Sequence, residues 1–327
     1  MGAVGQDPAG VALMDLTLTE DQELIQRTAR EFLSAHAGAS ARAVAGDPAG
    51  YSTATWKEVV DLGWTGVAFD ESMGFLEACL LAGEFGRFAV PSPFTASLVC
   101  GMAVESLRPE IAAGRVYTFA STVDGVAELV PYAEAADGFV VAAGDSVSVV
   151  ESAAEIVRQD VIGLDPKYRV RFAGQGEPVH VAPSLVRAYG AAATCAEMVG
   201  GAQAVLDESV SYATQREQFG RPIGAFQAVQ HHCANMAIDV LGSRFIAYEA
   251  IWRLSRGLDA AVEVAVAKSW VSEAYQRVCS LGHQIHGAIG FTAEHDLHFH
   301  TRHAIASALA FGDADEHTEA LARQLGL

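Results

Sequence analysis

The 327-residue sequence lacks the features that mark membrane proteins, secreted proteins and nucleic-acid-binding proteins. No apolar run approaches the ~20 residues that a transmembrane helix needs, and the start lacks the charged-then-apolar layout of a signal peptide. Lys and Arg number 21 against 40 Asp and Glu, so the formal net charge of −19 argues against nucleic acid and anionic membranes as partners. We therefore expect a cytoplasmic protein with no membrane insertion.

Cysteine is scarce and shows no pairing pattern. The five cysteines lack metal-type spacing, and most fall in apolar runs of helical period: Cys79, Cys100, Cys195, Cys233 and Cys279. This distribution favours buried free thiols in a reducing compartment over disulfides. Because basic residues are also few, binding of an anionic ligand would depend on local basic side chains.

Apolar periodicity is what the sequence has in quantity, with 51% hydrophobic residues. It predicts a mainly α protein of three units. Residues 1–115 form an N-terminal helical domain, which includes the capping-box spacing of Thr19 and Gln22. Residues 116–183 form a small β-barrel-like middle domain, and residues 184–327 form a four-helix bundle of long antiparallel segments that mediates oligomerisation. Alternating β-branched residues place strands at 116–119, 138–142, 146–150 and 168–172.

Residues 212–230 join two long segments of helical period and have the sequence YATQREQFGRPIGAFQAVQ. Glycine and proline punctuate this stretch, which predicts a helix, a tight connector and a second helix. Arg216 then lies near a helix end with Phe219 on the turn. The guanidinium could bind a phosphate while the ring packs against a ligand. Alternatively, Arg216 caps helix carbonyls and Phe219 enters the core.

This stretch, together with QIHGAIGFT at residues 284–292, resembles the C-terminal domain of acyl-CoA dehydrogenases. The resemblance covers nearly the whole chain and is strong from about Leu185 to Arg302. It implies the fold of that family, here with a reduced middle β domain, and FAD as the cofactor. The implied reaction is α,β-dehydrogenation of a CoA thioester, in which a base takes the α-proton and a hydride passes to FAD.

In that family FAD lies across a subunit boundary. The middle domain of one subunit holds the flavin, and turns in the C-terminal domain of its neighbour hold the ADP part. The resemblance assigns the ADP-side contacts in this chain to Arg216, Gln218, Phe219, Phe226, Gln227, Gln284, Gly287 and Ala288. Ala288 replaces a usual glycine, which weakens the close backbone approach expected there.

The features that the family needs for its own flavin and for its chemistry are missing. Tyr117–Gly125 replaces the flavin-side signature, and no tryptophan between Trp64 and Trp252 covers a flavin ring. The position of the catalytic glutamate holds Phe311, and the alternate position used by a minority branch falls at or beside Gly190. The sequence therefore predicts no catalytic residue of its own in this chain.

Acidic and histidine clusters leave alternatives open. One acidic group could substitute for the missing base, or could stabilise the N-terminal dipole of a last helix: Asp313, Asp315 and Glu316. A histidine-rich run could bind a metal, although the family commonly carries aromatic and basic residues there: His295, His298, His300 and His303. His231 and His232 are adjacent on a helix and face different directions. The prediction is no metal.

The chain keeps the ADP-side residues but lacks the flavin-side signature and the catalytic glutamate. In this it resembles the short, non-catalytic subunit of actinobacterial α2β2 acyl-CoA dehydrogenases, many of which act on steroid side-chain CoA thioesters. The sequence predicts that a longer partner subunit carries the catalytic glutamate and binds most of the acyl-CoA. Two alternatives remain open: a self-sufficient homo-oligomer with a displaced base, and a flavin-free scaffold or regulatory protein. The identity of the acyl group is not readable from the sequence.

Overall fold

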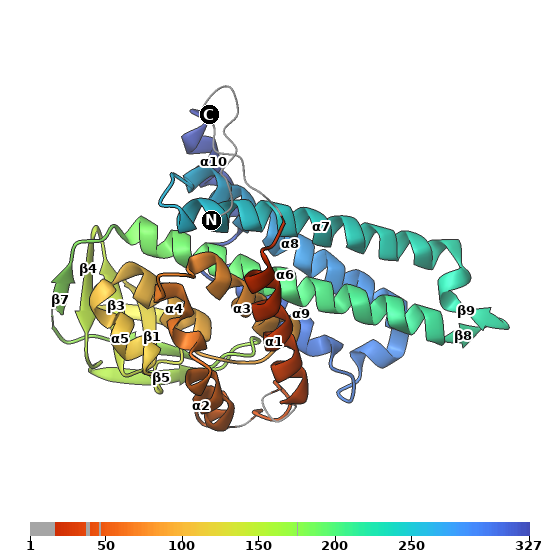
Figure 1. Ribbon diagram of the computed structural model, residues 1–327, viewed down its shortest axis with the longest axis horizontal. Helices are drawn as coiled ribbons and strands as arrows, with labels where there is room; N and C mark the ends of the chain where they lie inside the picture. The colour runs from red at the N-terminus through yellow and green to blue at the C-terminus, as the bar shows by residue number, and fades with distance from the viewer. Residues whose placement is uncertain (1–16, 37–39, 46, 175) are drawn as a thin grey trace.

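The computed structural model describes residues 17–36, 40–45, 47–174 and 176–327. The start of the predicted N-terminal domain, residues 1–16, lies outside them. Helix α6 runs the length of the molecule, and N-terminal helices, a pair of small sheets and the rest of a helical bundle pack around it (Figure 1). This arrangement confirms the predicted mainly α fold, with helices at both ends of the chain and a small β region between them.

The described part of the N-terminal region is helical, as predicted. The capping box at Thr19 and Gln22 is formed in both directions at the start of the first helix. Helix α3 is buried on nearly every side, because it lies between α1 and α6. Helix α4 ends at Ala103, and a short 3-10 turn and a further helix follow it. The elements are α1 Glu20–Ala35, α2 Thr53–Asp61, η2 Trp64–Phe69, α3 Phe75–Arg87, α4 Phe94–Ala103, η3 Glu105–Leu107 and α5 Arg108–Ala112.

The middle region contains two sheets. The four-stranded sheet has the order β1-β3-β4-β7, with β1 and β3 parallel, and the three-stranded sheet has the order β2-β6-β5. The four predicted strands are present as β1, β3, β4 and β6. The strands are β1 Tyr117–Thr122, β2 Val126–Pro131, β3 Gly138–Ala143, β4 Ser146–Val150, β5 Glu155–Gln159, β6 Lys167–Arg171 and β7 Glu177–Val179.

The C-terminal region is helical, as predicted, and the last of the four predicted long segments is divided into two helices. Three long helices are accompanied by two short ones, α9 and α10, which both pack on α8. The chain breaks between them because Ala310 is extended and both Phe311 and Gly312 have positive φ, at 57° and 99°. The elements are α6 Pro183–Gln215, β8 Glu217–Gln218, β9 Arg221–Pro222, η4 Ile223–Ala225, α7 Gln227–Ser255, α8 Ala261–His286, η5 Gly287–Phe291, α9 Leu297–Leu309 and α10 Ala314–Gln324.

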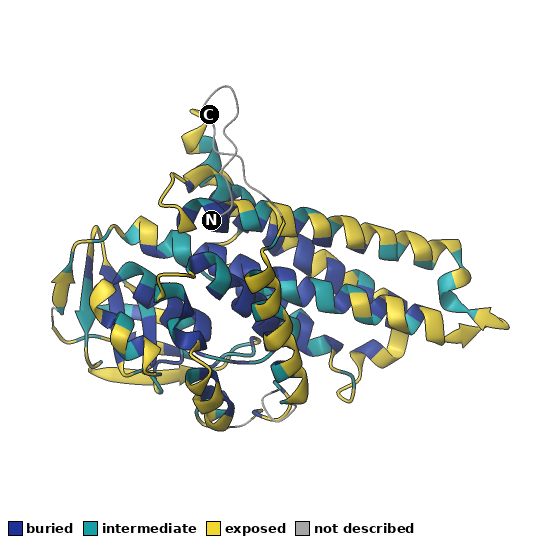
Figure 2. Cartoon of the chain, in the orientation of Figure 1, coloured by how far each residue is buried: buried dark blue, intermediate teal, exposed yellow. Residues whose placement is uncertain are grey.

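Buried residues concentrate where α3 and α8 each pack against α6, whereas α1, α7 and the β8–β9 hairpin carry many exposed residues (Figure 2). Four of the five free cysteines are buried and Cys233 is half-buried, as the sequence predicts. Among the described residues, no helix combines the length and the apolar character needed to cross a bilayer.

Candidate functional site

Residues 212–230 contain the end of α6, a hairpin and the start of α7, which matches the predicted order of helix, tight connector and helix. Arg216 is the C-terminal cap of α6, and its backbone N–H donates to the carbonyl of Tyr212 at 2.8 Å. Strands β8 and β9 then form a tight hairpin whose tip residues, Phe219 and Gly220, both have positive φ. Two consecutive left-handed residues suit a two-residue hairpin turn. The hairpin therefore projects from the end of the bundle (Figure 1).

The Arg216 side chain does not cap the helix carbonyls, and the Phe219 side chain does not enter the core. The Phe219 side chain is 91% exposed, so it does not enter the core. The Arg216 guanidinium is exposed and makes no hydrogen bond or ion pair within the described ranges 17–36, 40–45, 47–174 and 176–327. A charged fork and an aromatic ring are thus both free to contact a molecule outside this chain.

The C-terminal end of α8 lies at the same end of the bundle as the hairpin. Tyr212, one turn before Arg216, stacks on His286 with ring centroids 4.5 Å apart. Gln284, Gly287 and Ala288 are exposed there and line a cavity of about 630 Å³ between α8 and α9. Gly287 has a φ of 63° and a ψ of −141°, a conformation that glycine adopts readily and other residues rarely.

The remaining predicted ADP-side residues lie on and beside the hairpin. Gln218 ends β8, Phe226 precedes α7, and Gln227 begins α7. The Phe226 ring is half-buried and lies under the Arg221 guanidinium, 4.3 Å from ring centroid to carbon. We call residues 216–227 and 284–291 together the hairpin end of the bundle. The fold brings all eight predicted residues to this one end.

A second cavity, of about 500 Å³, lies between the sheets, α4, α6 and the turn between α9 and α10. We call it the interdomain cavity. Phe119 and Phe311 line it, with their rings stacked at a centroid separation of 6.0 Å. Gly190 lies directly beneath Phe311, so a methyl group at position 190 would clash with that ring. The two positions named for a catalytic glutamate are therefore in contact, and neither residue can take a proton.

Lys268 fixes the turn that carries Phe311. Its side chain is fully buried, and Nζ donates to Ser272 Oγ at 3.1 Å and to the carbonyls of Ala308 and Gly312 at 2.8 Å each. Burial lowers the pKa of Lys268 to about 8. The carbonyls on both sides of the turn are thus tied to α8.

The acidic residues after this turn have the geometry of a helix start. The Asp313 carboxylate caps α10 by accepting from Glu316 N at 2.9 Å, and Glu316 pairs with Arg187. Asp315 lies exposed in the first turn. These positions match the helix-dipole interpretation of the cluster.

Glu197 is a candidate that the sequence analysis missed. It lies on α6 about two helical turns after Gly190 and lines the interdomain cavity, with its side chain 20% exposed. Thr95 Oγ donates to its carboxylate at 2.5 Å, and His303 Nε2 lies 3.9 Å away. The signal in the sequence was a single acidic residue, Glu197, among the small and apolar residues of AAATCAEMV at 191–199. The structure buries all the other residues of this segment.

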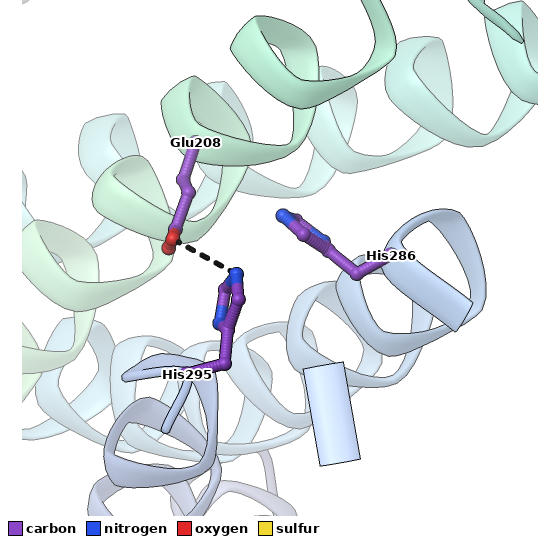
Figure 3. Close-up of side chains that lie close together, drawn as sticks. All are labelled: Glu208, His286 and His295. Carbon is purple, nitrogen blue, oxygen red and sulfur yellow. Dashed lines mark ion pairs between the residues drawn. The ribbon is translucent and has the colours of Figure 1, made fainter. Parts of the chain in front are cut away.

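The histidine-rich run divides between two places. His300 and His303 are buried beside the Tyr275 hydroxyl, at 3.0 and 3.4 Å, and burial lowers the pKa of His300 to about 3. His295 instead lies near Glu208 of α6 and near His286 (Figure 3). Sequence reasoning could not group these three, because they come from separate segments.

Comparison with known proteins covers both helical regions. Residues 19–108 match the model for the N-terminal domain of acyl-CoA dehydrogenases, and residues 187–326 match the model for the C-terminal domain. The chain is 28% identical over 310 residues to acyl-CoA dehydrogenase IpdE2 of Mycobacterium tuberculosis, covering 90% of this chain and 93% of that protein. It is 30% identical to acyl-CoA dehydrogenase FadE34 of the same organism, covering 89% of this chain and 46% of that protein.

Two solved structures have the same fold. The ChsE4–ChsE5 complex from Mycobacterium tuberculosis contains a chain with a TM-score of 0.84 and 22% identity, covering 96% of this chain and 99% of that one. A variant of the steroid ACAD Tcur3481–Tcur3483 also gives a TM-score of 0.84, with 23% identity and coverages of 95% and 99%.

Proposed function

The chain belongs to the acyl-CoA dehydrogenase family, and from this premise we propose that it is the subunit of a heteromeric enzyme that supplies ADP-side FAD contacts to a partner chain. The observation that carries the proposal is a contrast within one chain. Arg216 and Phe219 are exposed at the hairpin end, where the Phe219 ring touches only the edge of Phe226 among the described aromatic rings, whereas Phe311 and Gly190 occupy the two candidate base positions at the interdomain cavity.

The groups at the hairpin end fit the ADP half of FAD. Arg216 would bind the pyrophosphate through its fork of donors, which is a charge-assisted and often bidentate interaction. Phe219 would pack against a ring, and Gln284 would supply an amide. Gly287, with its positive φ, permits a close approach to the backbone. Bound FAD supplies the hydride acceptor for α,β-dehydrogenation of a CoA thioester.

The partner in this proposal is a longer acyl-CoA dehydrogenase chain that carries the catalytic glutamate and binds most of the acyl-CoA. Two of the similar solved structures have names that join two proteins, and one of them is called a steroid ACAD. These names support a heteromeric assembly and a steroid-derived CoA thioester as the substrate class, and the α2β2 stoichiometry is carried over from the family resemblance. The predicted cytoplasmic location stays a prediction.

An exposed apolar stripe on α7 supports assembly through the bundle. Ile238, Leu241 and Phe245 are all exposed and recur at helical spacing, and Trp270 of α8 is also exposed. Contiguous apolar surface of this kind is typical of subunit interfaces, so we place the partner bundle against α7.

The test is co-expression of the chain with a longer acyl-CoA dehydrogenase chain from the same genome, followed by flavin quantification. We expect the chain alone to purify without flavin and the complex to carry one FAD per pair of unlike chains. Stoichiometric FAD in the isolated chain would contradict the proposal. A stable complex without flavin would favour the scaffold alternative.

A second candidate function is a self-sufficient dehydrogenase in which Glu197 is the displaced base. The observation that favours it is a largely buried carboxylate in a cavity lined by Phe119 and Phe311. This alternative requires the isolated chain to bind FAD and to oxidise an acyl-CoA, and requires Glu197→Gln to abolish that activity. If the isolated chain has no activity, the alternative is excluded.

A further inference from the structure

We propose that Glu208, His286 and His295 form a binding site for a divalent transition-metal cation of the zinc class. The site lies where α6, the end of α8 and the loop before α9 meet (Figure 3). This proposal does not depend on the proposed role in FAD binding.

The three side chains converge from three separate segments. Their ligand atoms, two imidazole nitrogens and one carboxylate oxygen, all lie within 4.8 Å of one another. His295 Nε2 is 3.6 Å from Glu208 Oε1. Figure 3 shows the three groups pointing into a common space. Two histidines and one glutamate form a donor set that Zn²⁺ uses in sites that keep an open fourth position.

His286 has the surroundings of a metal-binding imidazole. Its residue is 4% exposed, and Nδ1 lies 2.8 Å from the carbonyl of Gly282. Because a carbonyl can only accept, Nδ1 carries the proton and Nε2 keeps its lone pair. That Nε2 is buried and has no hydrogen-bond partner among the residues that the structure describes. A buried acceptor without a partner is uncommon, and a cation in the common space would satisfy it.

His295 must rearrange its proton for the cation to bind. Its Nδ1 accepts from Leu297 N at 3.2 Å, so the neutral ring carries its proton on Nε2, toward Glu208. Binding through Nε2 requires that proton to move to Nδ1, and the long bond from Leu297 is lost. The Glu208 carboxylate then balances part of the cation's charge.

The position of the site suggests what bound metal would stabilise. His286 is the last residue of α8, and Gly287 and Ala288 follow it directly in η5. Tyr212 stacks on the same imidazole. A cation would therefore tie α6 to the turn that carries half of the hairpin end.

The experiment is titration of the full-length, chelator-treated chain with Zn²⁺ alone, by calorimetry and by competition with a chromogenic chelator. We expect one equivalent to bind, and Co²⁺ at the same site to give the visible absorption bands of a low-coordinate complex. Loss of groups that only support metal ligands costs ~10- to 100-fold in affinity, so loss of a ligand should cost at least ~100-fold. Glu208→Gln and His286→Ala should each show this loss.

Two control variants keep the experiment interpretable. His231→Ala removes an exposed histidine of α7, and His298→Gln removes a histidine of the same run outside the cluster; both should bind Zn²⁺ as the native chain does. Glu208 is 41% exposed, so Glu208→Gln should fold even if His286→Ala does not. Absence of stoichiometric binding, or full affinity in folded Glu208→Gln, would overturn the proposal.

Discussion

The hairpin end of the bundle and the interdomain cavity differ in which groups are left free. At the hairpin end, the Arg216 guanidinium makes no hydrogen bond or ion pair within the described chain, and the Phe219 ring touches the edge of Phe226 while remaining 91% exposed. At the interdomain cavity, aromatic rings stack on each other, a glycine lies against one of them, and a buried lysine holds the turn. The first region has exposed groups to which the proposed function assigns FAD contacts, whereas the second is stabilised by contacts within the chain.

Under the proposed function, this contrast separates the two halves of a shared site. Contacts that serve a neighbour need only an exposed, well-positioned surface. Contacts that serve a subunit's own chemistry need a base and room for the reacting groups. Here the base positions hold Phe311 and Gly190, which support each other by packing.

The largest expected effect is on the stability of the turn at the interdomain cavity. Lys268→Ala should lower the free energy of unfolding by about 2–5 kcal/mol, because it leaves a cavity and removes the donor to two buried carbonyls. Chemical denaturation monitored by circular dichroism would measure the change. Lys57→Ala is the matched control, since Lys57 is exposed and should change stability by less than about 0.5 kcal/mol. A loss as small as the control's would mean that Lys268 does not hold the turn.

The next largest effect is expected on FAD affinity at the hairpin end of the bundle. Arg216→Ala should weaken FAD binding by the complex by roughly 10- to 150-fold, since a charge-assisted bond to phosphate contributes about 1.5–3 kcal/mol. Arg216→Lys should restore affinity only partly, because lysine lacks the fork of donors. Flavin retention through dialysis and fluorescence titration would measure both.

The control for Arg216 is another exposed arginine at the far end of α7. Arg256→Ala removes the same charge and should leave FAD affinity unchanged. Full flavin retention by the Arg216→Ala complex would remove the main support for the shared site.

A smaller effect is expected from changing the contact between Gly190 and Phe311. Gly190→Ala should destabilise the chain by about 1–3 kcal/mol, because the added methyl group clashes with the Phe311 ring. Removing that ring in the double variant Gly190→Ala/Phe311→Ala should relieve the clash and recover part of the loss. A double-mutant cycle of unfolding free energies measures the coupling between the two positions. Strictly additive effects would mean that the two residues do not pack as described.

The smallest expected effect is none. Phe311→Glu restores a carboxylate at the family position, yet the complex should gain no turnover at this site, because Tyr117–Gly125 replaces the flavin-side signature. Steady-state acyl-CoA oxidation by the chain alone and by the complex would measure it. Substantial turnover by the variant chain alone would favour the displaced-base alternative.

Much of the fold followed from local patterns in the sequence. Glycine and proline after α6 predicted the connector, and the position of Arg216 at a helix end followed from it. The capping box at Thr19 was likewise local. Three strands were missed for physical reasons. Strand β2 contains a register shift between Ala127 and Val130, β5 is exposed nearly throughout, and β7 has only three residues. The start of a last helix at Asp313 was anticipated as one interpretation of the acidic cluster, but the left-handed conformation of Phe311 was not, because a left-handed phenylalanine has no marker of its own in the sequence.

The site was predictable only where its residues lie close together in the sequence. Arg216 and Phe219 belong to one motif, so their exposure at one turn could be anticipated as an alternative. Glu197 gained its place in the cavity from packing against Thr95 and His303, which lie far from it in the chain. The grouping of Glu208 with His286 and His295 likewise depends on how α6 and α8 end beside each other.

The exposed hairpin end has a consequence for the production of the protein in a cell. Phe219 and Phe291 are 91% and 72% exposed, and the α7 stripe adds further apolar surface. In the proposed heteromeric assembly, newly made copies that outnumber the partner chain would keep this surface uncovered and become targets for aggregation and proteolysis. We therefore expect the abundance of this chain to follow that of its partner, so that the two behave genetically as a single dose-matched unit.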